Sequence, residues 1–127
     1  MRLQSEVQQD IQTTFQGSVN IENLFELAIE SANKGYKLKA MEIAREALIF
    51  AKQSNDYLAV YIHGFLTVLC IDFKNTSHAK IHVFNALNRL NQRHFSFVSD
   101  QQYLNALLKK INRLESPVSH LNEPIAA

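Results

Sequence analysis

The chain has 127 residues, a net charge of +1 and a single cysteine. Apolar residues make up 46% of it and charged residues 20%, which is the composition of a globular protein and excludes an intrinsically disordered one. Only three Gly and two Pro are present, whereas an all-β chain needs many tight turns. The sequence therefore favours long helices in one all-α domain.

No segment of the sequence predicts secretion or insertion into a membrane. The first residues contain no apolar run of the kind that a signal peptide has. The longest apolar stretch, residues 57–73, includes His63 and Asp72 and is shorter than the roughly 20 residues of a membrane-spanning helix. Cys70 lies in this stretch, and a lone buried thiol is typical of a reducing compartment. We therefore expect a cytoplasmic protein.

Residues 1–17 are predicted to form an amphipathic helix. Its apolar residues recur every four positions, at Leu3, Val7, Ile11 and Phe15. This spacing gives one narrow apolar stripe on a helix whose other faces are polar. We expect the stripe, or the helix predicted at 100–114, to cover one end of the domain or to pair with a second copy of the chain.

Residues 18–115 are predicted to form the helical domain. Asn20 can cap a helix that ends before Gly35, where a left-handed C-terminal cap is expected. Further helices with apolar residues at helical spacing follow at about 36–53, 56–73, 77–92 and 99–115. The one at 56–73 is apolar on nearly all sides and is expected to be central. The remaining tail, residues 116–127, has no periodicity and is predicted to be flexible.

An internal repeat relates these helices at an offset of 39 residues. The small residues Ala40 and Ala47 of the helix at 36–53 recur as Ala79 and Ala86 of the helix at 77–92. Small side chains there let two paired helices approach closely. The pattern resembles the tetratricopeptide repeat (TPR), a helix pair with a typical period of 34 residues. These alanines occupy the positions of that family's small residues.

The resemblance implies an antiparallel array of helix hairpins, with about two TPR-like repeats and flanking capping helices, five to six helices in all. An unrelated helical bundle is the alternative. The resemblance also implies a non-catalytic interaction module (an adaptor, scaffold or regulatory subunit) that binds another protein or a peptide in a groove lined by the first helix of each pair. The candidate groove residues are Asn23, Glu26, Glu30, Asn33, Tyr57, Tyr61, His63 and Phe65.

No constellation of residues predicts an enzyme. His78 and His82 have the spacing of two metal ligands, but the Glu and the third ligand of the zinc-protease motif are missing, so a solvated helix face is preferred. Cys70 follows His63 by seven residues, but its neighbours are hydrocarbon, which favours a structural core cysteine over a nucleophile. We therefore expect no catalytic site, no metal and no cofactor.

A basic segment offers an alternative function. Seven basic residues lie between positions 74 and 113: Lys74, Lys80, Arg89, Arg93, Lys109, Lys110 and Arg113. They could contact phosphates, with Phe95 and Phe97 available for stacking. The net charge is close to zero and no nucleic-acid-binding motif accompanies them. A small nucleic-acid-associated regulator is therefore ranked below a protein or peptide partner.

Overall fold

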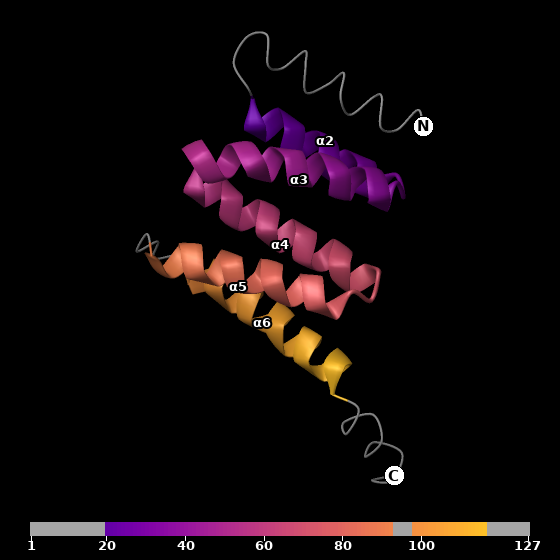
Figure 1. Ribbon diagram of the computed structural model, residues 1–127, viewed down its shortest axis with the longest axis vertical. Helices are drawn as coiled ribbons and strands as arrows, with labels where there is room; N and C mark the ends of the chain where they lie inside the picture. Colours follow the sequence, from indigo (N-terminus) through magenta and orange to yellow (C-terminus); the bar gives the residue numbers. More distant parts are fainter. Residues whose placement is uncertain (1–19, 93–97, 117–127) are drawn as a thin grey trace.

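The computed structural model describes residues 20–92 and 98–116, and this part of the chain forms five helices and no strand (Figure 1). The helices are α2 (Ile21–Asn33), α3 (Lys37–Ser54), α4 (Asp56–Asp72), α5 (Thr76–Gln92) and α6 (Val98–Glu115). The prediction of an all-α fold is thereby confirmed. The helix predicted at 1–17 and residues 117–127 of the predicted tail lie outside the described residues.

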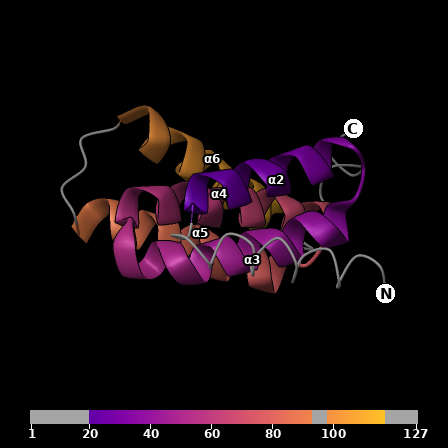
Figure 2. The same cartoon turned by 90° about the horizontal axis from the view of Figure 1, so that it is seen from above.

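The helices form an antiparallel array in which each one packs against the next. The contacting pairs are α2 with α3, α3 with α4, α4 with α5, and α5 with α6, and α4 also contacts α6. Figure 1 shows the resulting zigzag from α2 to α6. Seen from above, α2, α4 and α6 lie in one layer and α3 and α5 in the other (Figure 2). One face of the described helices is therefore built from α2, α4 and α6.

Alanines lie where the two layers of helices pack against each other. Ala40, Ala47, Ala79 and Ala86 have no exposed surface. They belong to the helices of the second layer, α3 and α5, and a methyl group there lets the helix backbones of the two layers come close. The four alanines on which the 39-residue offset was based are thus all core residues.

The two hairpin turns repeat each other at the same 39-residue offset. The residue in the left-handed conformation is Gly35 in the first turn, with φ 90°, and Lys74 in the second turn, with φ 59°. In both turns the residue after the left-handed one donates its backbone N–H to a carbonyl five residues earlier, at 2.8 Å. This is the bond that closes a helix with a Schellman motif. The repeat predicted from side chains is therefore also present in the backbone.

Helix α4 lies at the centre of the array, as its apolar sequence predicts. It packs against α3, α5 and α6, and Phe65 on α4 contacts Phe25 on α2. No helix within the described ranges has the length and the apolar character that a membrane span requires.

Candidate functional site: a groove over α4

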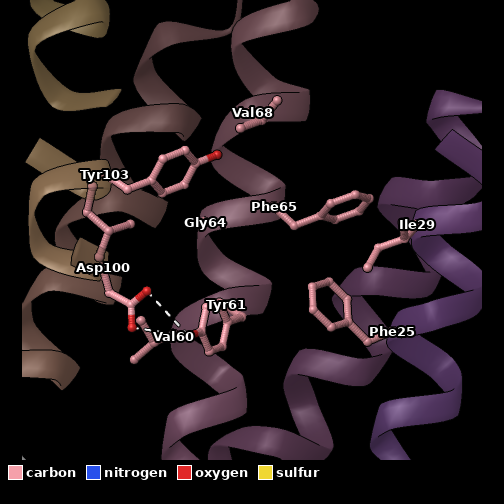
Figure 3. Close-up of a pocket in the computed structure, with 10 residues that line it drawn as sticks. Phe25, Ile29, Val60, Tyr61, Gly64, Phe65, Val68, Asp100 and Tyr103 are labelled. Carbon is pink, nitrogen blue, oxygen red and sulfur yellow. Dashed lines mark hydrogen bonds between the residues drawn. The ribbon is translucent and has the colours of Figure 1, made fainter. Parts of the chain in front are cut away.

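A groove with a volume of about 400 Å³ lies over α4, with α2 on one side and α6 on the other (Figure 3). Its lining residues are Phe25 and Ile29 on α2, Val60, Tyr61, Gly64, Phe65 and Val68 on α4, and Asp100, Tyr103 and Leu104 on α6. Asp100 alone among these ten carries a charge. An apolar cleft with a few polar groups at fixed places is the general form of a ligand-binding site.

Gly64 forms the floor of this groove. The 39-residue offset that relates the hairpins also relates Phe25 on α2, Gly64 on α4 and Tyr103 on α6. One position of the repeat is therefore aromatic on the two flanking helices and glycine on the central helix. Figure 3 shows the open space between the two walls above Gly64.

Packing does not require a glycine at position 64. A Cβ atom there would lie 3.7 Å from Cδ2 of Leu104 and 4.0 Å from Cε2 of Tyr103, which is ordinary van der Waals contact. A glycine inside a helix lowers stability by roughly 0.5–1 kcal/mol relative to alanine. What the glycine provides is the open volume of the groove.

Aromatic rings build the walls of the groove. The rings of Phe25 and Phe65 meet edge to face, with their centroids 5.5 Å apart. Such a contact fixes the orientation of both rings. On the opposite wall the residue Tyr103 is 54% exposed. The groove is thus open to solvent and has at least one wall that is held in place by packing.

The polar end of the groove is a cluster of two tyrosines and one aspartate. The hydroxyl of Tyr61 lies 3.1 Å from Oδ2 and 3.3 Å from Oδ1 of Asp100, and that of Tyr57 lies 3.4 Å from Oδ2. The two hydroxyl oxygens are 2.5 Å apart. The hydrogen bond with Tyr57, burial and the Asp100 carboxylate raise the pKa of Tyr61. Its hydroxyl therefore keeps its proton and remains a donor.

The structure gathers only some of the predicted groove residues. Tyr61 and Phe65 line the groove, and Tyr57 extends its polar end through Tyr61. The placement of His63 on the concave surface was wrong, because His63 is 1% exposed and its ring faces His82 on α5. A helix turns 100° per residue, so position 63 points away from the face that carries Tyr61 and Phe65.

The four residues predicted on α2 are exposed but do not line the groove. They are Asn23, Glu26, Glu30 and Asn33. Glu30 is engaged in an ion pair with Lys34, at 3.0 Å. The wall on this side is formed by Phe25 and Ile29, which are not among the predicted groove residues. Extending the 39-residue offset to α6 would have found this wall, because it joins Phe25 to Gly64 and Tyr103.

His63 and His82 form a pair inside the array. Their Nδ1 atoms are 3.0 Å apart, so one ring donates a hydrogen and the other accepts it. Burial, and the charge of the partner ring, lower the pKa of His63 to about 3. Burial, and the positive charge of Arg45, lower the pKa of His82 to about 4. Both rings are therefore neutral at pH 7.

His78 and Cys70, which were weighed as a possible metal ligand and nucleophile, have the following surroundings. His78 bonds to Asn75 at 3.0 Å, and within the described ranges no three His, Cys, Asp or Glu side chains meet as metal ligands would. Cys70 is buried, and burial raises the pKa of its thiol. The interpretation of Cys70 as a buried thiol is confirmed.

The described basic residues lie on α5, on α6 and in the turn before α5. Lys80 on α5 forms an ion pair with Glu115 on α6, and this hydrogen bond lowers the pKa of Glu115. The pair places the end of α6 beside the start of α5. Lys109, Lys110 and Arg113 precede Glu115 on α6, and Arg89 lies in the last turn of α5. Lys74 is in the turn before α5, and Arg93 lies outside the described residues.

The predicted homo-oligomer stays a prediction. Leu3, Val7, Ile11 and Phe15 lie outside the described residues. The helix predicted at 100–114 is α6, which exposes Val98 and Leu114 at its two ends.

Comparison with known proteins leaves the groove as the main guide to function. No protein-family model matches the sequence, and no curated protein or solved structure is significantly similar to it. Function is therefore inferred from the geometry and chemistry described above.

Proposed function

We propose that this protein is a non-catalytic, TPR-like interaction module that binds a segment of another protein in the groove over α4. Such a module serves as an adaptor, a scaffold or a regulatory subunit. The observation that carries the proposal is Gly64: a residue that weakens its helix, that packing does not require, and that keeps a groove open between aromatic walls.

The form of the groove favours a helical or extended peptide over a small molecule. It is open along the face built from α2, α4 and α6, and Tyr103 on one wall is exposed. A small-molecule site usually encloses most of its ligand. An open apolar groove between helices instead suits an amphipathic helix that places apolar residues into it at one-turn intervals.

The experiment is a selection of peptides on the full chain, using a display library of helical peptides of about 16 residues with one face randomised. The test variant is Gly64→Leu, which adds a side chain to the groove floor. The matched control is Asn88→Leu, which adds the same side chain at an exposed position of α5 in the other layer. Circular dichroism checks that both variants are folded.

We expect selected peptides to bind the unmodified chain and Asn88→Leu with equal affinity. Gly64→Leu should weaken them by about tenfold or more, because a filled pocket removes the central anchor of an interface. Peptides that bind Gly64→Leu as well as the unmodified chain would show that the groove is not the binding site. A selection that enriches no peptide would also count against the proposal.

A further inference from the structure

The groove is apolar along its length but carries a negative charge at one end. Among its lining residues only Asp100 is charged, and Asp100 lies in the first turn of α6. On α2 the position that the 39-residue offset relates to Tyr61 and Asp100 is Glu22, which is exposed. Glu22 precedes Phe25 by three residues, so it lies on the same side of its helix as that wall of the groove. Both walls therefore end in a carboxylate.

Within the part of the chain that the structure describes, the Asp100 carboxylate is short of hydrogen-bond donors. Its partners there are the hydroxyls of Tyr57 and Tyr61, which also bond to each other. Each hydroxyl has one hydrogen, so after one is used between the two tyrosines, one remains for Asp100. A carboxylate has room for about four donors. Within residues 20–92 and 98–116, Asp100 forms no ion pair with Lys, Arg or His.

An ammonium or guanidinium group complements the cluster of Tyr57, Tyr61 and Asp100. It brings several N–H donors and a positive charge, and it can bond to a carboxylate while it contacts tyrosine rings. A ligand carboxylate or phosphate would instead face Asp100 and Glu22 with a charge of the same sign. The charge at this end of the groove thus selects for a cationic side chain.

We propose that the segment bound in the groove presents a Lys or Arg side chain to Asp100, one helical turn from an apolar side chain seated over Gly64. Asp100 and Tyr103 are three residues apart on α6, and Tyr61 and Gly64 are three apart on α4. The charged end and the open floor are therefore separated by about one turn. A helical partner matches both with a basic and an apolar residue three or four positions apart. This inference rests on the proposed function.

The test uses the same display library on the full chain and on Asp100→Asn, which keeps the size and the acceptor oxygen of the side chain but removes its charge. Glu46→Gln is the matched control, because it removes one negative charge from α3, outside the groove. Each enriched peptide is then synthesised in two forms, with its basic residue kept or replaced by Gln, and its Kd is measured against all three proteins.

We expect sequences enriched on the unmodified chain and on Glu46→Gln to carry Lys or Arg three or four residues from an apolar anchor. Replacing that residue by Gln, or Asp100 by Asn, should each weaken binding about tenfold, since a hydrogen bond between charged groups is lost. The two changes together should weaken it little more than either alone. The affinity should also fall as the salt concentration rises.

Two failures can be told apart. If enriched peptides are weakened by Gly64→Leu but show no preference for Lys or Arg, or bind Asp100→Asn unchanged, the cationic contact is wrong and the groove remains the binding site. If Gly64→Leu has no effect on any enriched peptide, the proposed function fails and the inference fails with it.

Discussion

His63, which is buried, and His82, which is half-buried, occupy two positions that the first repeat fills with hydrocarbon. At the 39-residue offset they correspond to Leu24 and Ile43, both buried. Both histidines have a pKa below the ordinary 6.5 in the folded chain, at about 3 and about 4. As the pH falls below 6.5, the unfolded chain therefore takes up protons that the folded chain does not. The stability due to this pair is complete above pH 6.5 and is lost as the pH falls toward these lower values.

Replacing the pair by its counterparts from the first repeat, His63→Leu with His82→Ile, should flatten this pH dependence. Each histidine contributes a slope of up to about 1.4 kcal/mol per pH unit to the free energy of unfolding in that range. Urea denaturation at pH 7, 6, 5 and 4 measures the difference between the double variant and the unmodified chain. Parallel curves for the two proteins would contradict the pair's role.

The single variants are the controls for that experiment. Each leaves one imidazole with no partner for its Nδ1 atom, and a buried polar group without a hydrogen bond costs about 1–3 kcal/mol. The double variant removes both polar groups together. At pH 7 it should therefore lose less stability than the sum of the two single variants.

Gly64→Ala tests whether the glycine serves the groove or the fold. The added methyl group meets only ordinary contacts, the nearest at 3.7 Å, and alanine favours the helix. We expect the free energy of unfolding to rise by roughly 0.5–1 kcal/mol, measured by denaturant or thermal unfolding. A loss of stability of that size would show that close packing, and not the groove, requires the glycine.

At the scale of the elements, the two hairpin turns give a matched comparison. Both use a left-handed residue, but the first has Gly35 and the second has Lys74. A residue with a Cβ atom loses about 1–2 kcal/mol in that conformation. Gly35→Ala should therefore destabilise the chain by about 1 kcal/mol, and Lys74→Gly should stabilise it.

Lys74→Ala is the control, because it removes the charge but keeps the Cβ atom. It should therefore change stability little. A gain in stability equal to that of Lys74→Gly would contradict the backbone explanation.

The helices themselves could be predicted from the sequence, because their signals are local. Gly35 and the alanines at the 39-residue offset mark a hairpin end and helix faces that the structure confirms. The groove could not be predicted in the same way. Phe25 has the spacing of a core residue on α2, and no local signal shows that this half-buried residue also lines a groove. The groove lies over Gly64, which is 39 residues away in the sequence.

Asp100 and His63 are two polar residues whose surroundings could not be predicted from local sequence signals. An acidic residue in the first turn of a helix is explained by the helix dipole alone, so its place beside Tyr57 and Tyr61 goes unnoticed. A histidine in an apolar helix fits a binding surface as well as a core. Aligning position 63 with the apolar residue Leu24 would have favoured the core.

At the scale of the whole molecule, stability should decrease from the centre of the array to its ends. Helix α4 packs against α3, α5 and α6 and touches α2 through Phe65, whereas α2 and α6 each contact fewer of the helices in residues 20–92 and 98–116. Helices in such arrays gain stability from their neighbours. Hydrogen exchange followed by mass spectrometry should find the slowest backbone exchange in α4. Slowest exchange in α2 or α6 would contradict this packing order.

The central claim is that a partner segment binds over Gly64 on the face built from α2, α4 and α6. The most direct test is NMR of the chain with ¹³C-labelled methyl groups, mixed with an unlabelled peptide from the selection. We expect intermolecular NOEs from the peptide to the methyl groups of Ile29, Val68 and Leu104, and none to Ile81 and Leu87 on α5. NOEs to Ile81 and Leu87 without any to the groove methyl groups would contradict it.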